Sequence, residues 1–264
     1  MEAPNLLSSS SRSLGDPFSE EESAMKSVES ALEKIERPIV VATHPRSGTH
    51  LTIDLLRKQF EDCKGWLWFG ETLHHLYLNL DRLIPGHTPS LSVEKAFGLL
   101  RRAPRPTIKT HSTPDLENHE NRGRRLGELL LERGDILYVV RDGRDVLCSA
   151  YLWQQELGID CSLQEFLRRQ VNGVSRVRWW AEHVTTWVQH EGVNVICFEE
   201  IIDQPRQMIE RLGCILDLSP RFVEPYLPEK VENGSRWTDY WRRLTRDFES
   251  TAITGRPNGK SPPE

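Results

Sequence analysis

The sequence predicts an α/β fold of three layers, with helices on both faces of a central parallel sheet. Two observations lead to this prediction. Short, uninterrupted apolar runs, which are typical of strands buried on both faces, alternate along the chain with amphipathic helical stretches. The loops between them are short, which favours right-handed βαβ units and hence parallel strands. The runs that fit such strands are Pro38–Ala42, Pro106–His111, Asp135–Arg141 and Val193–Phe198.

Apolar residues at helical spacing mark the segments between these strands. Helices are expected over Ser23–Ile35, from Leu51 onward, over Ser90–Arg102 and Leu126–Leu131, from Val146 to Tyr151, within Gln164–Gln189, and from Met208 to Leu212. Within Gln164–Gln189, small apolar residues recur at spacings of three and four, which predicts that they form the buried face of that helix. The residues of this stripe are Val174, Val177, Ala181, Val184 and Val188.

The length of 264 residues allows one large α/β domain or two small ones. No internal repeat is evident, so we expect a single domain over residues 25–254. Residues 1–24 are rich in Ser and Glu, which predicts a disordered leader. Residues 255–264 are expected to form a flexible tail.

Composition excludes several classes of function. A net charge of −5 argues against general binding of nucleic acids, because such proteins are usually strongly basic. The five cysteines stand far apart without a CxxC pair, so we expect small buried hydrophobic residues for most of them, no metal and a reducing compartment. No apolar run approaches the length of a membrane span, and no signal peptide is evident. Together these features favour a cytoplasmic protein.

A polar turn, Thr43–His50, separates the first strand from the helix that follows it. Such a turn presents unpaired backbone N–H groups and the positive end of a helix dipole, and therefore attracts phosphate or sulfate. Gly48 allows the backbone to approach the anion, Ser47 and Thr49 offer hydroxyl donors, and Arg46 supplies charge. The alternative is an ordinary strand-to-helix turn. The pattern GxxxxGK[ST] is absent because no Lys follows Gly48, which weakens an NTP-hydrolysing interpretation.

Two other strands end in residues suited to the same site. The run at Pro106–His111 carries Lys109 and His111, which alternation places on one side of the strand. The run at Asp135–Arg141 ends in Arg141. Ligands of open α/β sheets bind beyond the carboxyl ends of the strands, where the polar turn also lies. A lone Lys or His there is most often incidental, but these residues together with Arg46 predict a site.

The segment Gly65–Pro89 is rich in rings. Its rings belong to Trp66, Trp68, Phe69, His74, His75 and Tyr77. One interpretation is a helical layer of the core that also covers a surface. The other is one wall of an apolar pocket for an acceptor molecule, because ligand sites are apolar with few polar groups.

In order and spacing, these motifs resemble the cytosolic-type sulfotransferases, which use 3′-phosphoadenosine 5′-phosphosulfate (PAPS). The polar turn reads THPRSGTHL and is similar to that family's 5′-phosphosulfate loop, YPKSGTTWL. The segment KTHSTPDL is similar to KTHLPxxLLP, and YVVRDGRDVLCSAY to the 3′-phosphate motif YVxRNPKDVxVSYY. CFEEIIDQP parallels YEDLKxDP. The resemblance covers roughly residues 38–215 and implies a P-loop NTPase-like topology.

The resemblance implies a role for each matching residue. His111 falls on the family's catalytic histidine and is the expected general base, because imidazole titrates near neutrality. Lys109 and Arg46 are expected to stabilise the negative charge on the leaving oxygen. The residues implied to contact PAPS are Arg46, Ser47, Gly48, Thr49, His50, Arg141, Ser149 and Phe198. Arg141 and Ser149 match the 3′-phosphate positions, and Phe198 matches an aromatic position near the adenine.

The family also closes a segment RKGxxGDW over PAPS, and this chain has NGSRWTDYWRRLT in its place. Gly234 and Arg236 are therefore candidates for contacting the cofactor, with Arg242 and Arg243 after them.

The function implied is transfer of a sulfuryl group from PAPS to a hydroxyl or amine of a small acceptor, leaving the product PAP. No metal is expected, because sulfate carries less charge than phosphate. Rings around Trp66–Tyr77, with Tyr151 and Trp153, favour an aromatic or ring-containing alcohol or phenol, and a carbohydrate is compatible. The alternatives are a P-loop-type kinase that uses ATP and a catalytically silent nucleotide-binding protein. The sequence favours no particular oligomeric state.

Overall fold

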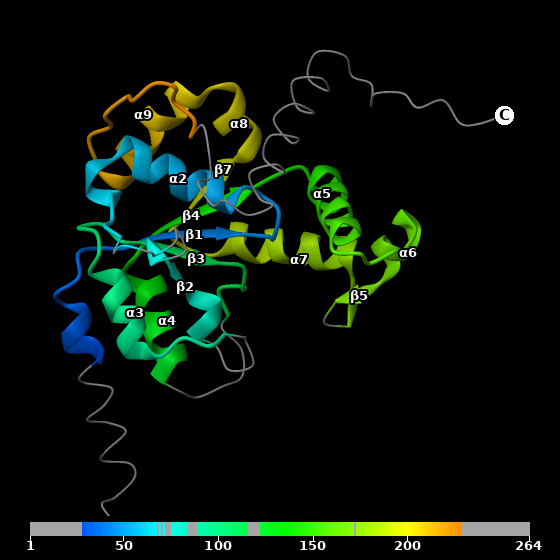
Figure 1. Cartoon of the computed structure of the whole chain (residues 1–264), viewed down its shortest axis with the longest axis horizontal. Helices are drawn as coiled ribbons and strands as arrows, with labels where there is room; N and C mark the ends of the chain where they lie inside the picture. Colours follow the sequence, from blue (N-terminus) through cyan, green and yellow to red (C-terminus); the bar gives the residue numbers. More distant parts are fainter. Residues whose placement is uncertain are drawn as a thin grey trace, which may run out of the picture.

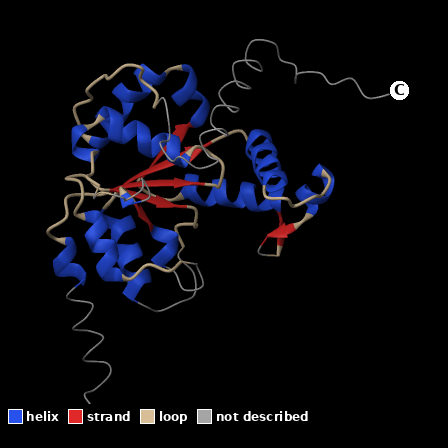
Figure 2. Cartoon of the chain, in the orientation of Figure 1, coloured by secondary structure: helices blue, strands red, loops and turns tan. Residues whose placement is uncertain are grey.

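The computed structural model describes residues 28–67, 69, 71, 75–83, 89–115, 122–171 and 173–228. Its centre is a sheet of five strands in the order β2-β3-β1-β4-β7, and all of its pairings are parallel. The strands are β1 (Ile39–Thr43), β2 (Leu78–Asn79), β3 (Thr107–Thr110), β4 (Asp135–Val140) and β7 (Val193–Cys197). Helices cover both faces of this sheet (Figures 1 and 2), which confirms the predicted three-layer fold.

Strand β1 is the centre of the sheet. Its residue Val41 pairs with Lys109 of β3 on one side and with Leu137 of β4 on the other. All five residues of β1 are buried, as expected for a strand covered on both faces. Because the strands are parallel, Thr43, Thr110 and Val140 end at one edge of the sheet, and the polar turn leaves from its middle. This central position of the first strand and its loop is the P-loop NTPase-like topology.

One face of the sheet carries α2 (Thr49–Gln59), α8 (Phe198–Asp203) and α9 (Pro205–Leu216) (Figure 1). These helices pack on Ile39, Val41, Leu137 and Val139. The other face carries α3 (Val93–Leu100), α4 (Arg122–Arg133) and α7 (Arg176–Gln189), which pack on Val40, Ala42, Ile136 and Tyr138. Successive strand residues point to opposite faces, so each strand contributes to both cores.

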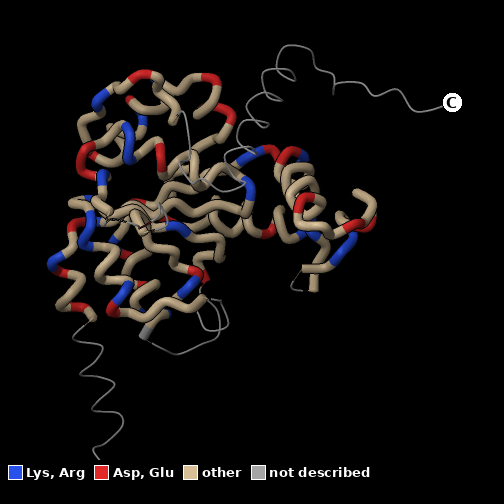
Figure 3. The backbone as a smooth tube through the Cα atoms, viewed as in Figure 1, with Lys and Arg blue, Asp and Glu red and all other residues tan. Residues whose placement is uncertain are grey.

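A small lobe extends beyond the carboxyl edge of the sheet (Figure 1). It consists of α5 (Gly143–Glu156), α6 (Leu163–Arg168), the hairpin of β5 (Gln170–Val171) and β6 (Val174–Ser175), and the start of α7. Helix α6 begins with a capping box, in which Ser162 accepts from the Glu165 amide and Glu165 accepts from the Ser162 amide. Lys and Arg residues are mixed with Asp and Glu over the described chain (Figure 3).

The predicted buried stripe is wrong for most of its residues, although Val184 packs against the core. Val177 and Val188 are 47% and 49% exposed, whereas His183 and Trp187 are buried. The reason is the partner of the helix: α7 lies on β4, where Tyr138 stacks on Trp187 with ring centroids 5.8 Å apart and contacts His183. Ring stacking and hydrogen bonds therefore decide which face of α7 is buried.

The segment Gly65–Pro89 also departs from its predicted helical layer. In its described part the chain forms strand β2 and a 3₁₀ helix, η3 (Leu80–Leu83), which follows directly. Another 3₁₀ helix, η1 (Glu61–Cys63), precedes it. Trp66 is 51% exposed, whereas Tyr77 is buried. Trp68 and His74 lie outside the described residues.

The prediction for the cysteines is wrong for most of them. Only Cys63 is buried, Cys148 and Cys214 are exposed, and Cys161 and Cys197 are intermediate. All five thiols are free. Residues 28–32 are helical within the expected helix at Ser23–Ile35, and the predicted leader and tail lie outside the described residues. Among the helices of the described chain, none combines the length and the apolar character that crossing a bilayer requires.

Candidate functional site

The turn between β1 and α2 has the backbone of an anion-binding loop. Arg46 and Gly48 have left-handed φ angles of 75° and 100°, and Gly48 is the N-cap of α2 without a side-chain hydrogen bond to the helix. The loop packs closely on α8, since a Cβ added at Gly48 would lie 2.7 Å from Cε2 of Phe198. Because glycine has no side chain that could cap the helix, an anion bound at the first turn of α2 could take the place of a cap.

The loop hydroxyls fit the same purpose. Ser47 Oγ is buried and makes no hydrogen bond to any residue that the structure describes. A buried hydroxyl without a partner is costly, by about 1–3 kcal/mol. An anion oxygen in the loop would relieve that cost. Thr49 Oγ1 lies 2.6 Å from Thr43 Oγ1, so the end of β1 holds the first residue of α2.

The second strand-loop-helix unit meets this loop directly. Arg141, just after β4, is 6% exposed, and its Nη1 donates to the carbonyl oxygen of Arg46 at 3.3 Å. Ser149, in the second turn of α5, accepts from Arg46 Nε at 3.3 Å. Asp142 caps α5 by accepting from the Arg144 amide at 2.8 Å. The structure therefore brings Arg46, Arg141 and Ser149 together at one edge of the sheet.

Phe198 and His50 flank the loop. Phe198 is 2% exposed, and its ring lies between Gly48 and the guanidinium of Arg141, whose Cζ is 4.5 Å from the ring centroid. The ring of Phe198 thus packs against the loop at Gly48 and against Arg141. His50 lies in the first turn of α2 and makes an edge contact with Tyr77 at 5.8 Å between ring centroids. Trp153 of α5 lies 5.9 Å from the guanidinium carbon of Arg46.

His111 follows the last residue of β3, beside the end of β1. Its Nδ1 lies 2.8 Å from the carbonyl oxygen of Thr43 and 3.1 Å from Thr43 Oγ1. A carbonyl can only accept, so Nδ1 carries the proton of the neutral ring and donates it. Nε2 then holds the lone pair, and it has no hydrogen-bond partner among the described residues.

Burial lowers the pKa of His111 to about 4, and the nearby charge of Lys109 acts in the same direction. The ring is therefore neutral at pH 7 and can accept a proton. Burial also lowers the pKa of Lys109, against the opposing effect of Asp81. Lys109 lies in β3 and His111 directly follows it, and the two side chains are close enough to influence each other.

Asp81 is a buried carboxylate that the sequence analysis missed. It accepts hydrogen bonds from the amides of His111 and Ser112 and from the hydroxyls of Thr110 and Ser112, at 2.8–3.2 Å. A signal was present, since Asp81 follows the apolar run LYLNL, where a carboxylate needs partners.

Two buried histidines were missed as well. His183 of α7 has Nε2 at 3.1 Å from the carbonyl oxygen of His111 and Nδ1 at 3.0 Å from Tyr138 Oη. His44 lies in the polar turn with its ring 4.4 Å from that of Trp179. Burial lowers the pKa of His183 to about 4 and that of His44 to about 3. Both are therefore neutral at pH 7.

Two predicted site residues, Gly234 and Arg236, lie outside the described residues, as do Arg242 and Arg243. Within the described ranges, no group of three or more His, Cys, Asp or Glu side chains is arranged to hold a metal ion.

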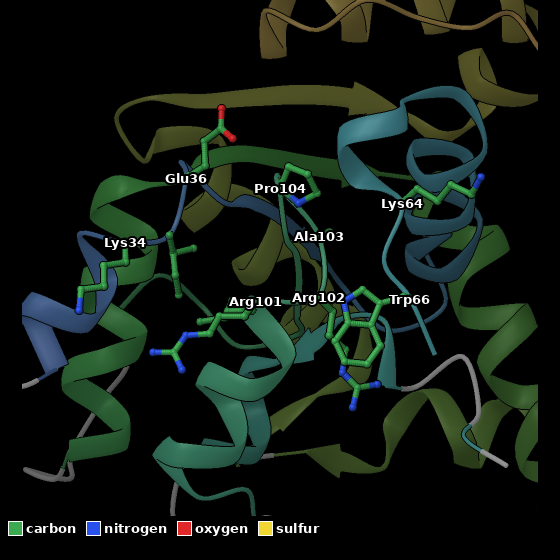
Figure 4. Close-up of a pocket in the computed structure, with 10 residues that line it drawn as sticks. Lys34, Glu36, Lys64, Trp66, Arg101, Arg102, Ala103 and Pro104 are labelled. Carbon is green, nitrogen blue, oxygen red and sulfur yellow. The ribbon is translucent and has the colours of Figure 1, made fainter. Parts of the chain in front are cut away.

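A cavity of about 500 Å³ lies at the opposite edge of the sheet (Figure 4). Residues that precede β1 and β3 line it, with Trp66 and the end of α3. Two of the cationic side chains that line the cavity are paired with carboxylates. Arg102 Nη2 lies 2.7 Å from Glu71 Oε1, and Lys64 Nζ lies 3.7 Å from Glu61 Oε1. Trp66, one of the rings expected in an acceptor pocket, lines this cavity instead. None of the residues predicted for catalysis or for PAPS binding lines it, so the cavity is separate from the site at the carboxyl edge.

Comparison with known proteins agrees with the motifs. The model of the sulfotransferase domain family matches residues 36–233. A 3-beta-hydroxysteroid sulfotransferase of Cavia porcellus is 28% identical over 86 residues, which cover 30% of this chain and 30% of that protein. The match thus spans less than a third of that relative's length.

Two solved structures have a similar chain path. Mouse sulfotransferase SULT7A1, solved with PAP, is 16% identical with a TM-score of 0.44, and the match covers 90% of this chain and 93% of that one. A sulfotransferase from Alicyclobacillus acidocaldarius is 17% identical with a TM-score of 0.49, over 84% of this chain and 98% of that one.

Proposed function

The chain belongs to the sulfotransferase domain family, and from this membership we propose that it is an enzyme that transfers a sulfuryl group from PAPS to a small acceptor. The observation that carries the proposal is the meeting of two cationic strand-loop-helix units with a neutral imidazole. Arg46 contacts both Arg141 and Ser149, and His111 lies at the end of the neighbouring strand.

The residues present fit a nucleotide with two anionic groups. The amides of the first turn of α2, the buried hydroxyl of Ser47, and Arg46 would hold the phosphosulfate. Arg141 and Ser149 would hold the 3′-phosphate, which distinguishes PAPS from ATP. Thr49, His50 and Phe198 complete the proposed contacts. Gly234 and Arg236 stay candidates for closing over the nucleotide.

In the proposed reaction, the S–O bond to the phosphate oxygen breaks and a new bond forms between sulfur and the acceptor oxygen or nitrogen. The acceptor proton goes to Nε2 of His111, which holds the lone pair of the neutral ring. Lys109 and Arg46 stabilise the charge that grows on the phosphate oxygen. No metal is needed for these steps, because cations of the protein supply the positive charge.

We propose an alcohol, phenol or amine on an aromatic or other ring as the acceptor. Support comes from the rings near the site: Tyr77 beside His50, and Trp153 beside Arg46. A steroid alcohol is one member of this class, since a related protein is a 3-beta-hydroxysteroid sulfotransferase. A cytoplasmic location is proposed from the family resemblance and from the five free thiols.

The test has two stages. Thermal shifts with PAP and with ATP plus magnesium come first, and transfer of ³⁵S from labelled PAPS to a panel of alcohols, phenols and amines follows. We expect stabilisation by PAP and labelled product. His111→Ala should lower turnover by about 10²–10⁴-fold, whereas PAP affinity should stay within about twofold. His190→Ala, at the end of α7, is the matched control and should retain turnover.

Other outcomes point to the alternatives. Magnesium-dependent ATP turnover without PAPS turnover would favour the kinase. Binding of PAP without transfer to any acceptor would favour the silent nucleotide-binding protein. Near-native turnover of His111→Ala would remove His111 from the role of general base.

A further inference from the structure

The backbone of His111 is held on both of its sides. On one side, the His111 N–H donates to Asp81, with 3.1 Å to each carboxylate oxygen. On the other side, the carbonyl oxygen of His111 accepts from His183 Nε2 at 3.1 Å. Asp81 comes from η3 and His183 from α7, so two elements far apart in the chain meet at this one residue.

The next residue is held in the same way. The Ser112 amide donates to Asp81 at 3.2 Å, and the Ser112 carbonyl accepts from Trp187 Nε1 at 3.1 Å. His183 and Trp187 lie one helical turn apart on the buried face of α7, which explains why this face, and not the valine stripe, is turned inward.

The hydrogen bonds also set the proton positions in the second imidazole. A carbonyl oxygen only accepts, so His183 Nε2 must carry the proton that it donates to His111. His183 Nδ1 is then an acceptor, and the buried Tyr138 hydroxyl donates to it at 3.0 Å. Tyr138, His183 and His111 therefore form a chain of hydrogen bonds with one direction.

We propose that Asp81 and His183 are positioning residues for His111: they fix its main chain so that Nδ1 stays on the Thr43 carbonyl and Nε2 keeps the lone pair. From this main-chain position the ring of His111 reaches the carbonyl oxygen and the hydroxyl of Thr43. Without the hydrogen bond to Thr43, the neutral ring can carry its proton on either nitrogen, and the form with a proton on Nε2 cannot act as the base.

The expected loss of turnover rests on the proposed function, whereas the expected change in the proton position of His111 does not. The first measurement is therefore independent of turnover. NMR of the full chain labelled with ¹⁵N-histidine reports which imidazole nitrogen of His111 carries the proton. We expect the Nδ1–H form in the unchanged protein and a mixture of both forms in His183→Ala and in Asp81→Asn.

The second measurement separates positioning from a purely structural role. Loss of positioning should lower kcat by about 10- to 100-fold, because small displacements of a reacting group are costly, while the Kd of PAP stays within about twofold. His183→Gln, whose amide can still donate to the His111 carbonyl, should recover most of kcat. Tyr138→Phe should shift both readouts in the same direction as His183→Ala, but less. Thr185→Ala, exposed on α7, is the control and should change neither.

Every result of these measurements either supports or contradicts the positioning role of Asp81 and His183. An unchanged His111 proton position and unchanged kcat in His183→Ala overturn the proposal, even if Asp81→Asn fails to fold. So does a loss of kcat in His183→Ala that His183→Gln does not recover. If the unchanged protein transfers no sulfuryl group but the variants alter the His111 proton position, the proposed function fails and the positioning of the ring is upheld.

Discussion

Arg46 and Ser149 stand 103 positions apart in the chain, yet Nε of Arg46 donates a hydrogen bond of 3.3 Å to the hydroxyl of Ser149. Arg46 lies in the loop after β1, and Ser149 lies in α5, the helix that follows β4. The two strand-loop-helix units are therefore in direct contact at the proposed nucleotide site. Residues proposed for opposite ends of the nucleotide are in direct contact, so substitutions of them should not act independently.

A double-mutant cycle tests this coupling. We expect Arg46→Ala and Ser149→Ala each to weaken PAP binding, and the double variant to lose less than the sum of the two losses, by about 0.5–1.5 kcal/mol. Calorimetric titration of PAP into the four proteins measures the coupling. Losses that add within about 0.3 kcal/mol would show that the hydrogen bond does not matter for binding.

Arg141 should recognise the 3′-phosphate. Arg141→Ala is expected to weaken PAP by about 1.5–3 kcal/mol, the usual range for a charge-assisted hydrogen bond, and to affect adenosine 5′-phosphosulfate much less. Competition binding with both ligands measures the difference. Arg144→Ala is the matched control, because Arg144 lies in the first turn of α5 with a side chain 90% exposed. Equal losses for both ligands would contradict the assignment of Arg141.

Gly48 should tolerate no side chain. Its φ of 100° and the buried ring of Phe198 beside it mean that Gly48→Ala strains the backbone and displaces the ring. We expect the free energy of unfolding to fall by about 1–3 kcal/mol, and PAP binding to weaken. Gly98→Ala in α3 is the control, since an added Cβ there meets nothing within 4 Å, and it should stabilise the helix by about 0.5–1 kcal/mol. Urea unfolding of both variants checks this prediction, and equal effects would count against it.

Stability should fall as the pH falls from about 6.5 towards 4. Burial lowers the pKa of His44 to about 3 and those of His111 and His183 to about 4, from 6.5 in the unfolded chain. Between these values the unfolded chain binds protons that the folded chain does not, so acid favours unfolding. Each histidine contributes a slope of up to about 1.4 kcal/mol per pH unit.

Chemical unfolding at pH 7, 6 and 5 measures this slope. His44→Phe removes one of the three contributions and should make the dependence shallower. Phe keeps a ring at this position and removes the buried Nε2, which has no hydrogen-bond partner in the described part of the chain, at the loss of the hydrogen bond from Nδ1 to the Pro45 carbonyl. A free energy of unfolding that is the same at pH 7 and pH 5 would contradict the prediction.

The parts of the fold that depend on local sequence patterns could be predicted from the sequence. The apolar run before Thr43 and the glycine at 48 predict the central strand and its loop, because burial and a left-handed φ each restrict the residue type. Parallel pairing then predicts that Arg46, His111 and Arg141 meet at one edge. The contacts of these residues with PAPS stay predictions.

Features decided by distant partners were not predictable. Strand β2 has two residues, too few to show any periodicity. The buried face of α7 depends on Tyr138 of β4, and a pattern of valines within the helix carries no information about that partner. The apolar run before Asp81 signals a buried carboxylate, but the groups that satisfy it lie 29–31 positions further along the chain, so its partners could not be predicted.

Gln59, the last residue of α2, is hydrogen-bonded to the segment that follows α9. Its Nε2 donates to the carbonyls of Val223 and Tyr226 at 2.8 Å, and its Oε1 accepts from the Val223 amide at 2.8 Å. The opposite end of α2 is the loop around Gly48. Helix α2, 11 residues long, therefore connects the anion loop at its start with residues 223–226 at its end. Both ends of α2 are thus fixed by hydrogen bonds, the first residue by Thr43 of β1 and the last by the segment that follows α9.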